Sequence, residues 1–205
     1  SFPPRRSSDL PRRKLDLQLV TGTFPQLSEL FIYRPAVALA RRGHRVTVLA
    51  REAGDWSSFP ERLPADLRVQ LLPPDISLRD PRRALSVATH TLQSSLRRSA
   101  SAKALWRSCH ESPLTRTEPL RNFVRHLPFV SRRPALIHFE FLGTGAMYPL
   151  AGPLLGVPTV VSCRGSDIHL FGLRRAVAQE SMLACLRAAT AIHCVSDEVA
   201  AQVVR

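Results

Sequence analysis

The chain has 205 residues, of which 44% are hydrophobic, 22% are charged and only 6% are aromatic. This length and balance suffice for one domain with a buried apolar core, and they exclude fibrous, collagen-like and wholly disordered proteins. The four cysteines form no C-x-x-C pair and have no histidine at zinc-ligand spacing. We therefore expect no metal site, and we interpret the cysteines as small apolar residues in a reducing compartment.

The net charge of +13 is concentrated in two segments. Residues 1–14 hold five basic residues and one acidic residue, and residues 79–134 hold twelve basic and three acidic residues. The rest of the chain is balanced. We expect residues 1–14 to be a basic, flexible N-terminal segment that precedes a single domain over residues 15–205.

Neither a signal peptide nor a membrane span is predicted. The basic N-terminus is not followed by an apolar run. The uncharged stretch over residues 141–163 is long enough to span a bilayer, but three prolines and four glycines interrupt it. Because the chain starts without Met and stops at Arg205 inside a helical pattern, we expect it to be a fragment.

Short apolar runs alternate with amphipathic segments along the chain. In chain order, strands are expected over residues 15–20, 45–50, 67–72, 135–139, 159–163 and 191–195. Helices are expected over residues 28–42, 145–155 and 170–189, in pieces within 81–131, and after Ser196, which can cap the last one. This alternation predicts a Rossmann-like α/β fold, in which helices cover both faces of a parallel sheet.

Ligands of such sheets gather where strands end and helices begin, because unpaired N–H groups there favour anions. The first junction carries Thr21, Gly22 and Thr23, where the glycine would let the backbone approach a ligand; an ordinary turn is the alternative. Ser28 is expected to cap the following helix, with Glu29 favourable at its positive end. The G-x-G-x-x-G dinucleotide fingerprint is absent, which argues against nicotinamide binding.

The junction after the fourth strand carries two titratable residues. Strand alternation places His138 and Glu140 on one face of the sheet. Glu140 could accept hydrogen bonds from sugar hydroxyls, and His138 could donate or accept them. A structural role is the alternative for both residues, and we favour it for His138.

The junction after the fifth strand carries Arg164, Gly165, Ser166 and Asp167. A fixed arginine fork at this edge suits phosphate or sugar oxygens. The alternative is a structural pair in which Asp167 stabilises the start of the next helix beside Arg164. Ser196, after the sixth strand, has the pattern of a helix N-cap whose N–H groups could also meet a phosphate.

Several motifs carry a resemblance to a known family. Residues 24–32 (FPQLSELFI) and 42–46 (RGHRV) resemble the N-terminal signature of family 4 retaining glycosyltransferases with the GT-B fold, of the bacterial polysaccharide-assembly type. Residues 137–139, 158–167 and 189–196 are similar to later blocks of that family, in the same order. The resemblance covers residues 15–205.

The resemblance implies two Rossmann-like domains, of which this chain holds only the acceptor-side one; the nucleotide-sugar-binding domain is absent. The implied reaction transfers a hexose from a nucleotide-sugar to a saccharide or lipid-linked acceptor with retention, without cofactor or metal, in cell-surface polysaccharide or glycolipid synthesis. Arg164, Asp167 and Glu140 become the candidate catalytic residues. The candidate substrate-binding residues are Thr21, Gly22, Thr23, Ser28, Glu29, His138, Gly165, Ser166 and Ser196. We expect the fragment alone to be inactive.

The sequence also departs from the family pattern. The family often has histidine where Arg164 stands, a group implied to touch the transferred sugar, and often a second histidine where Glu140 stands. Leu30 replaces a threonine. These changes affect the individual contacts of the site more than the fold.

Two other classes of protein were weighed. A basic nucleic-acid-binding module would fit the sequence pI of about 11.3. Against it, the sheet-forming parts have balanced charge, and aromatic residues are not interleaved with arginines for base stacking. An NADP-type oxidoreductase would use Arg51 after the second strand, but it lacks the glycine fingerprint. We expect no nucleic-acid partner.

Residues 79–133 are a candidate surface for an anionic membrane, which would place the protein in the cytoplasm or at the inner face of the membrane. One expected helix has an apolar face of Leu85, Ala88, Leu92 and Leu96, and a second has Leu120, Phe123, Val124 and Leu127; the arginines are Arg82, Arg83, Arg97, Arg98, Arg121, Arg125, Arg132 and Arg133. Packing of both faces within the domain is the alternative, which we favour for the second helix.

Overall fold

The computed structural model describes residues 13–59, 62–73, 99–130, 133–170 and 176–204. Nearly all of the basic segment 1–14 and the first helix of the candidate membrane surface, with Arg82, Arg83, Arg97 and Arg98, lie outside the described residues.

Six parallel strands form one sheet in the order β3-β2-β1-β4-β5-β6. Their bounds are β1 (Asp16–Phe24), β2 (Arg45–Ala53), β3 (Leu67–Leu71), β4 (Leu136–Phe139), β5 (Thr159–Cys163) and β6 (Ala191–Cys194). The chain passes from the β3 edge across to β4, so that its two halves extend the sheet in opposite directions from β1 and β4. This topology confirms the Rossmann-like α/β fold.

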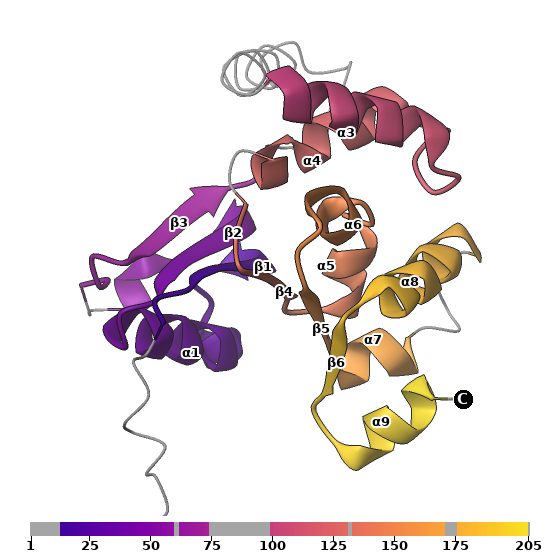
Figure 1. The fold of residues 1–205 in the computed structure, drawn as a ribbon. Helices are drawn as coiled ribbons and strands as arrows, with labels where there is room; N and C mark the ends of the chain where they lie inside the picture. The colour runs from indigo at the N-terminus through magenta and orange to yellow at the C-terminus, as the bar shows by residue number, and fades with distance from the viewer. Residues whose placement is uncertain (1–12, 60–61, 74–98, 131–132, 171–175, 205) are drawn as a thin grey trace, which may run out of the picture.

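Helices connect successive strands. In chain order they are η2 (Leu27–Glu29), α1 (Leu30–Arg41), η3 (Trp56–Ser58), α3 (Ser99–Glu111), α4 (Pro119–Val130), α5 (Leu142–Ala146), α6 (Ala151–Leu155), α7 (Gly165–His169), α8 (Ala176–Ala188) and α9 (Asp197–Val203). Figure 1 shows α1 beside the β1–β3 half of the sheet and α5, α6 and α8 beside the β4–β6 half, while α3 and α4 form a separate layer above.

Each face of the sheet has its own apolar core. On one face, Leu17, Leu19 and Val48 pack with Ile32 and Val37 of α1. The alternate strand positions point to the opposite face, which is the period that a strand imposes on its side chains. His138 of β4 and Ser162 of β5 have the same parity as Leu19, so they lie on the face of the sheet that α1 covers.

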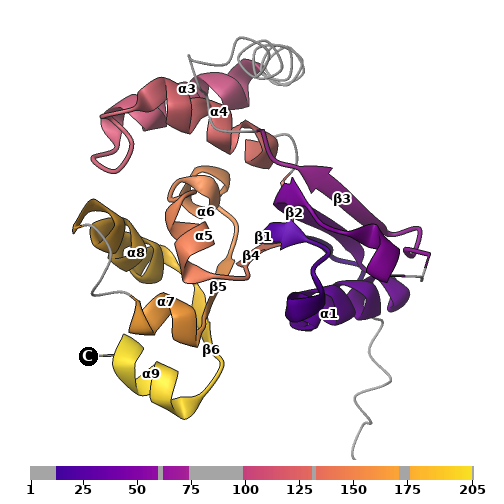
Figure 2. The same cartoon turned by 180° about the vertical axis from the view of Figure 1, so that it is seen from behind.

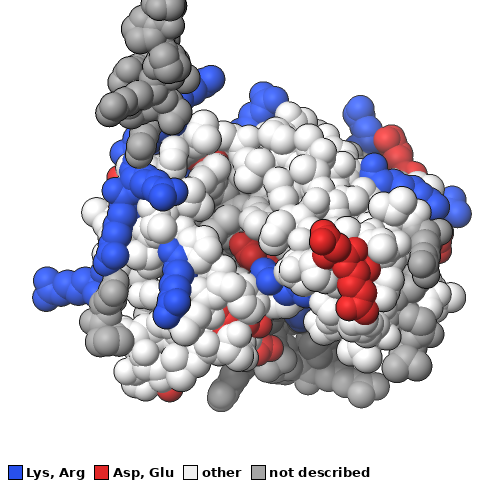
Figure 3. Space-filling view, turned by 90° about the horizontal axis from the view of Figure 1, so that it is seen from below, with Lys and Arg blue, Asp and Glu red and all other residues white. Residues whose placement is uncertain are grey.

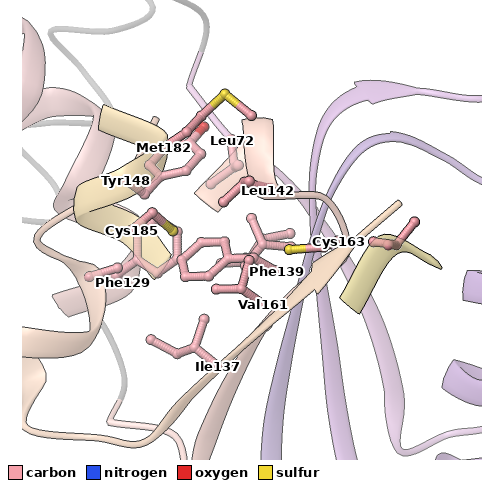
Figure 4. Packing of buried hydrophobic residues seen from close by; sticks show 14 residues of the cluster. Leu72, Phe129, Ile137, Phe139, Leu142, Tyr148, Val161, Cys163, Met182 and Cys185 are labelled. Carbon is pink, nitrogen blue, oxygen red and sulfur yellow. The ribbon is translucent and has the colours of Figure 1, made fainter. Parts of the chain in front are cut away.

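The core on the opposite face is built around β4 and β5. Figure 4 shows Ile137, Phe139 and Val161 directed from these strands toward Phe129 and Cys185 of the covering helices, and all five side chains belong to one buried cluster. Their burial orients the strands, because a shift by one residue would exchange this apolar set with the polar set on the other face.

Helix α4 packs within the domain. Leu127 is buried against Leu105 and Cys109 of α3, with Leu154 of α6 beside them, and Val124 is buried as well. For this helix the packing alternative is confirmed, although Leu120 remains 56% exposed. In the described segments, no helix combines the length and the apolar character that crossing a membrane requires.

The predicted ends of the first two strands were wrong. Thr21, Gly22 and Thr23 lie inside β1, because β2 continues to Ala53 and stays paired with it; Arg51 likewise lies inside β2. β-branched threonine is a favourable strand residue even near a strand end.

The other differences concern helices. Ser28 lies within η2 and caps nothing, since α1 begins at Leu30 with no side-chain cap. The helix expected over 145–155 is two helices, α5 and α6, because the residue before Pro149 is disfavoured in helical conformation. The helix expected over 170–189 begins, in the described residues, at Ala176. Ser196 caps α9 as predicted, accepting a hydrogen bond from the Val199 amide at 3.2 Å.

His126 of α4 is a fully buried histidine with both ring nitrogens occupied. Its Nδ1 lies 2.7 Å from the Asn122 carbonyl oxygen, and its Nε2 accepts from the Leu150 amide at 3.3 Å. The ring therefore carries its proton on Nδ1, and burial lowers its pKa to about 4. A second proton would have to displace the Leu150 amide, so the folded protein excludes the charged form.

We predict an acid-sensitive stability that depends on His126. Between pH 6.5, the ordinary histidine pKa, and about pH 4, the pKa of His126 in the folded protein, this histidine is protonated in the unfolded chain and neutral in the folded one. The free energy of unfolding should therefore fall as pH is lowered through this window, by up to about 3 kcal/mol. Urea unfolding at pH 4.5 and 7 measures it.

His126→Gln is the variant that isolates this effect. It should be less stable than the wild type at pH 7 yet lose less stability on acidification. His110→Gln, on an exposed turn of α3, is the matched control and should keep the wild-type pH dependence. An unchanged pH slope in His126→Gln would contradict the assignment.

Candidate functional site

The candidate site lies at the carboxyl ends of β1, β4 and β5. Helices α1, α7 and α9, which begin at this edge of the sheet, lie on the same side of the molecule in Figure 1 and, from behind, in Figure 2. Figure 3 views this side and shows a hollow near its middle in which basic and acidic atoms lie together. The predicted position of the site, at the junctions of strands and helices, is thus where charged side chains gather.

The centre of the site is an ion pair between Arg164 and Glu140. Arg164 Nη2 lies 3.2 Å from Glu140 Oε2, and its Nε donates to the Glu140 carbonyl oxygen at 3.0 Å. The Glu140 side chain is 6% exposed and that of Arg164 is 16% exposed. The guanidinium thus bridges the ends of β4 and β5 through two hydrogen bonds to one residue.

Two aromatic rings flank the guanidinium. Its central carbon lies 3.8 Å from the centroid of the Phe31 ring and 5.2 Å from that of Phe141. Both distances fall within the range of cation–π attraction. Phe31 is 42% exposed, so one ring of this cage forms part of the surface of the site. Arg164 is therefore held by contacts from α1, β4 and the turn before α5.

Burial changes the acidity of both carboxylates near Arg164. Burial raises the pKa of Glu140 to about 7, and the negative charge of Glu29 acts in the same direction, although the Arg164 charge and hydrogen bond oppose them. Burial also raises the pKa of Glu29, again against the Arg164 charge. Because this pKa lies near neutral pH, a small change in pH there changes the fraction of Glu140 that is protonated.

His138 and Glu140 lie on one face, as predicted. His138 Nδ1 lies 3.4 Å from Glu140 Oε1. Its other nitrogen, Nε2, lies 2.9 Å from the buried hydroxyl of Ser162, which in turn lies 3.1 Å from His193 Nδ1. Burial, with the neighbouring charges of His193 and Arg164, lowers the pKa of His138 to about 4, so it is neutral at pH 7.

Asp167 has a position of its own, apart from the Arg164 side chain. Its carboxylate is 4% exposed and accepts backbone hydrogen bonds from Leu142 at 3.2 Å, Gly143 at 3.1 Å and Arg164 at 3.3 Å. These amides open α5 and the turn into α7, where helices have unpaired N–H groups. The side chain that Arg164 contacts is Glu140, and the Arg164–Asp167 side-chain pair considered from the sequence is absent from the described contacts.

The remaining predicted residues divide between the site and its periphery. Thr21 is fully buried within β1, three residues before its end, and Glu29 lies close enough to influence Glu140. Ser28, Ser166 and Ser196 are exposed, and Ser196 already serves as the α9 cap. Gly22 and Thr23 belong to the paired end of β1, and Gly165 is the first residue of α7.

Two buried oxygens of the site, Thr21 Oγ1 and Glu29 Oε2, make no hydrogen bond of ordinary geometry among the described residues, although the Thr21 hydroxyl lies near enough to the Glu29 carboxylate to lower its pKa. Buried polar groups are paired in most proteins, so each unpaired oxygen needs an explanation. A carboxylate oxygen accepts only, and a hydroxyl both donates and accepts; a ligand rich in hydroxyl groups would satisfy both.

The sequence did not identify Phe31, Phe141, Ser162 or His193. Strand alternation could have pointed to Ser162 and His193. They lie on the same face of the sheet as His138, in the neighbouring strands β5 and β6. Without the register between strands, this alternation does not show which residues meet. The two phenylalanines resemble core residues in the sequence, and only the position of Arg164 gives them another role.

The described residues contain no cluster of metal ligands. Within the described ranges, no group of three or more His, Cys, Asp or Glu side chains is arranged to hold a metal ion. The cysteines are free, and Cys109, Cys163 and Cys185 are buried.

The fold places the chain among Rossmann-like α/β domains, and comparison with known proteins defines it further. Residues 29–205 match the family described as "Glycosyl transferase 4-like domain". The chain therefore belongs to this glycosyltransferase domain family. No curated protein matches the chain. Among solved structures, apo UGT2 of Phytolacca americana is similar with a TM-score of 0.37 and 16% identity; the match covers 77% of this chain and 32% of that one. The chain thus spans about a third of the length of that solved protein.

We predict that Asp167 is required mainly for stability. Asp167→Ala leaves three backbone N–H groups without their acceptor, and it should lower the free energy of unfolding by roughly 3 kcal/mol. Asp197→Ala, which removes an exposed carboxylate from the first turn of α9, is the matched control and should cost at most about 1 kcal/mol. Urea titration at pH 7 measures both. Equal costs for the two variants would refute the stabilising role.

Proposed function

We propose that the chain is the acceptor-side domain of a glycosyltransferase that moves a hexose from a nucleotide-sugar to a saccharide or lipid-linked acceptor, with retention at the anomeric carbon. Family membership supports the transferase class. The sugar, the retention and the acceptor class are parts of the proposal, as is a role in cell-surface polysaccharide or glycolipid synthesis. The reaction needs no cofactor or metal in this proposal.

The observation that carries the proposal is the composition of the site. The buried carboxylate of Glu140, the partly buried carboxylate of Glu29 and the Thr21 hydroxyl lie beside a fixed guanidinium and an exposed aromatic ring. Carboxylates and hydroxyls suit sugar hydroxyl groups, and the ring suits the apolar face of a pyranose. The guanidinium suits the charge that develops on a leaving diphosphate.

Each residue has a stated part in the proposed reaction. Glu29 and Thr21 bind hydroxyl groups of the acceptor and orient the attacking one, which lowers the entropic part of the barrier. Arg164 stabilises the departing phosphate oxygens. Glu140 adjusts the net charge of that pair, and Phe31 holds the guanidinium plane. Asp167 fixes the starts of α5 and α7, next to Glu140 and Arg164.

The arrangement of charge gives no support to the nucleic-acid alternative. On the face in Figure 3, several basic side chains lie along one side and others at the rim, while the hollow near the middle holds acidic and basic atoms together rather than a basic stripe. A nucleic-acid site would require a basic stripe that follows phosphates.

A donor panel tests the proposed function. The protein in its full natural length is incubated with UDP-, GDP- and ADP-hexoses and with saccharide or polyprenyl-linked acceptors, and nucleotide release and product anomeric configuration are measured. Release that depends on acceptor, with a product of the donor's configuration, supports the proposal. Transfer with inversion, or the absence of transfer with every donor, would overturn it.

We predict that Arg164 is needed for transfer and not for folding, provided that its partner Glu140 is neutralised in the same variant. Arg164→Ala alone leaves Glu140 buried without its cation, so a loss of stability would accompany any loss of activity. The double variant Arg164→Ala/Glu140→Gln removes both charges. It should keep most of the wild-type stability while kcat/KM for transfer falls tenfold or more, about 1.4 kcal/mol of transition-state stabilisation.

Arg133→Ala is the matched control for that variant. Arg133 is an exposed arginine before β4 whose Nη2 lies 3.4 Å from the Gly156 carbonyl oxygen, away from the strand ends. Its kcat/KM should stay near the wild-type value. Wild-type kinetics in the double variant would remove Arg164 from the proposed mechanism.

The membrane hypothesis remains a separate proposal. The charge of residues 79–134 would attract an anionic leaflet at the inner face of a membrane, at about 1 kcal/mol per basic residue before screening. Co-sedimentation with liposomes should rise with anionic lipid, fall with salt, and drop when Arg82, Arg83, Arg97 and Arg98 are replaced by Gln. Binding that ignores lipid charge would contradict it.

A further inference from the structure

A row of polar groups runs across three strands, from the buried ion pair to the surface. It begins at Glu140, passes through His138 and Ser162, and ends at the exposed His193. The three contacts measure 3.4 Å, 2.9 Å and 3.1 Å in that order. Ser162 is fully buried, and its hydroxyl lies between the two imidazoles and contacts both.

The single hydroxyl proton of Ser162 couples the two histidines. A serine hydroxyl that donates to one imidazole must accept from the other. When Glu140 is ionised, His138 carries its proton on Nδ1, toward the carboxylate. Its Nε2 then accepts from Ser162, and the hydroxyl oxygen accepts from His193 Nδ1–H.

The opposite order holds when Glu140 is protonated. The carboxyl O–H then points to His138 Nδ1, and His138 carries its proton on Nε2. Ser162 accepts that proton's hydrogen bond and donates to His193 Nδ1. The row therefore has two complete hydrogen-bonding patterns, and they differ by one proton on Glu140.

We propose that His193, Ser162 and His138 form a proton path between solvent and Glu140, and that an anion binding at Arg164 draws a proton along it. One proton from water binds His193 Nε2. His193 Nδ1–H passes to Ser162, the serine proton passes to His138 Nε2, and the His138 Nδ1 proton passes to Glu140 Oε1. Each intermediate group gains one proton and loses one, so only Glu140 changes its charge.

The coupling to an anion follows from the ion pair. While Glu140 is ionised, its charge cancels that of Arg164, with which it makes a 3.2 Å contact. Once Glu140 is protonated, Arg164 presents a full positive charge beside the exposed ring of Phe31. An anion that binds there stabilises the protonated form, so proton uptake and anion binding favour each other. This step rests on the proposed contact between Arg164 and a phosphate group.

Other charged groups surround the path. Glu29 faces Glu140 from the segment between β1 and α1, and its negative charge favours protonation of Glu140. Arg164, before α7, favours the ionised form. His193 and Arg164 both disfavour a charged His138, which keeps that ring a neutral carrier. The 3.4 Å contact between His138 and Glu140 is the longest in the row.

The tautomers of the two histidines test the path without any ligand. In protein labelled with ¹⁵N-histidine, long-range ¹H–¹⁵N spectra identify which ring nitrogen carries the proton. On lowering the pH from 8.5 to 5.5, His138 should change from the Nδ1–H to the Nε2–H form, and His193 should change its Nδ1 hydrogen bond with the same midpoint. In Ser162→Ala, His193 should no longer follow His138.

Two variants keep this test decisive. His193→Val removes the outer group at an exposed position and should shift the His138 midpoint, which covers the case in which Ser162→Ala fails to fold. Ser181→Ala removes an α8 hydroxyl that bonds the Val177 carbonyl at 2.9 Å, and it should behave as wild type. One tautomer of His138 across the whole pH range, or unchanged coupling in Ser162→Ala, would overturn the path.

Pyrophosphate binding tests the coupling separately. Calorimetry at pH 7 in two buffers of different ionisation enthalpy measures the protons exchanged per pyrophosphate bound. Because pyrophosphate itself titrates near this pH, the contribution of Glu140 is the difference between the wild type and Glu140→Gln, and the wild type should take up about half a proton more. Equal proton exchange in the two proteins would overturn the coupling. An absence of binding would instead count against the Arg164–phosphate contact of the proposed function, while the tautomer result still decides the path.

Discussion

The ion pair of Arg164 and Glu140 is the constraint on which the site depends. Both groups are largely removed from water, so each is costly to bury unless the other is present. Because the guanidinium also binds the Glu140 carbonyl and stacks on Phe31, this one side chain ties the end of β4 to the end of β5 and to the start of α1. Burial destabilises the charged form of Glu140 and brings its pKa to about 7, so a small change in its surroundings decides whether Glu140 keeps its charge.

Asp167 performs the complementary task for the backbone. Its carboxylate lies between the first turn of α5 and the turn into α7, and it accepts amides from both. Two short helices therefore begin at a shared anion that belongs to the protein itself. The three amides are therefore already paired with Asp167, and the cation of the site that a ligand could approach is Arg164, where the ends of β4 and β5 meet.

The sequence predicted the fold well because the fold rests on local periodicity. Each of the six strands was placed within a few residues, since its apolar positions alternate and its ends carry glycine, proline or polar residues. The shared face of His138 and Glu140 followed from the same alternation. The partner of Arg164 did not, because Asp167 is three residues away in the chain whereas Glu140 is 24 residues away, and only the register of β4 against β5 shows that the distant one is nearer to the guanidinium.

The residue that can change charge near neutral pH differs here from the family pattern. By the resemblance, the family often has histidine at the position of Arg164 and often a second histidine at that of Glu140. A histidine changes charge near neutral pH by itself, whereas an arginine keeps its charge at every physiological pH. With Arg164 fixed as a cation, the ability to change charge passes to its partner, and burial brings the pKa of Glu140 to about 7, close to where a histidine would have titrated. A permanently charged guanidinium beside an adjustable carboxylate can thus match the net charge that a lone imidazole would vary, while it keeps a fork of donors in place in both states.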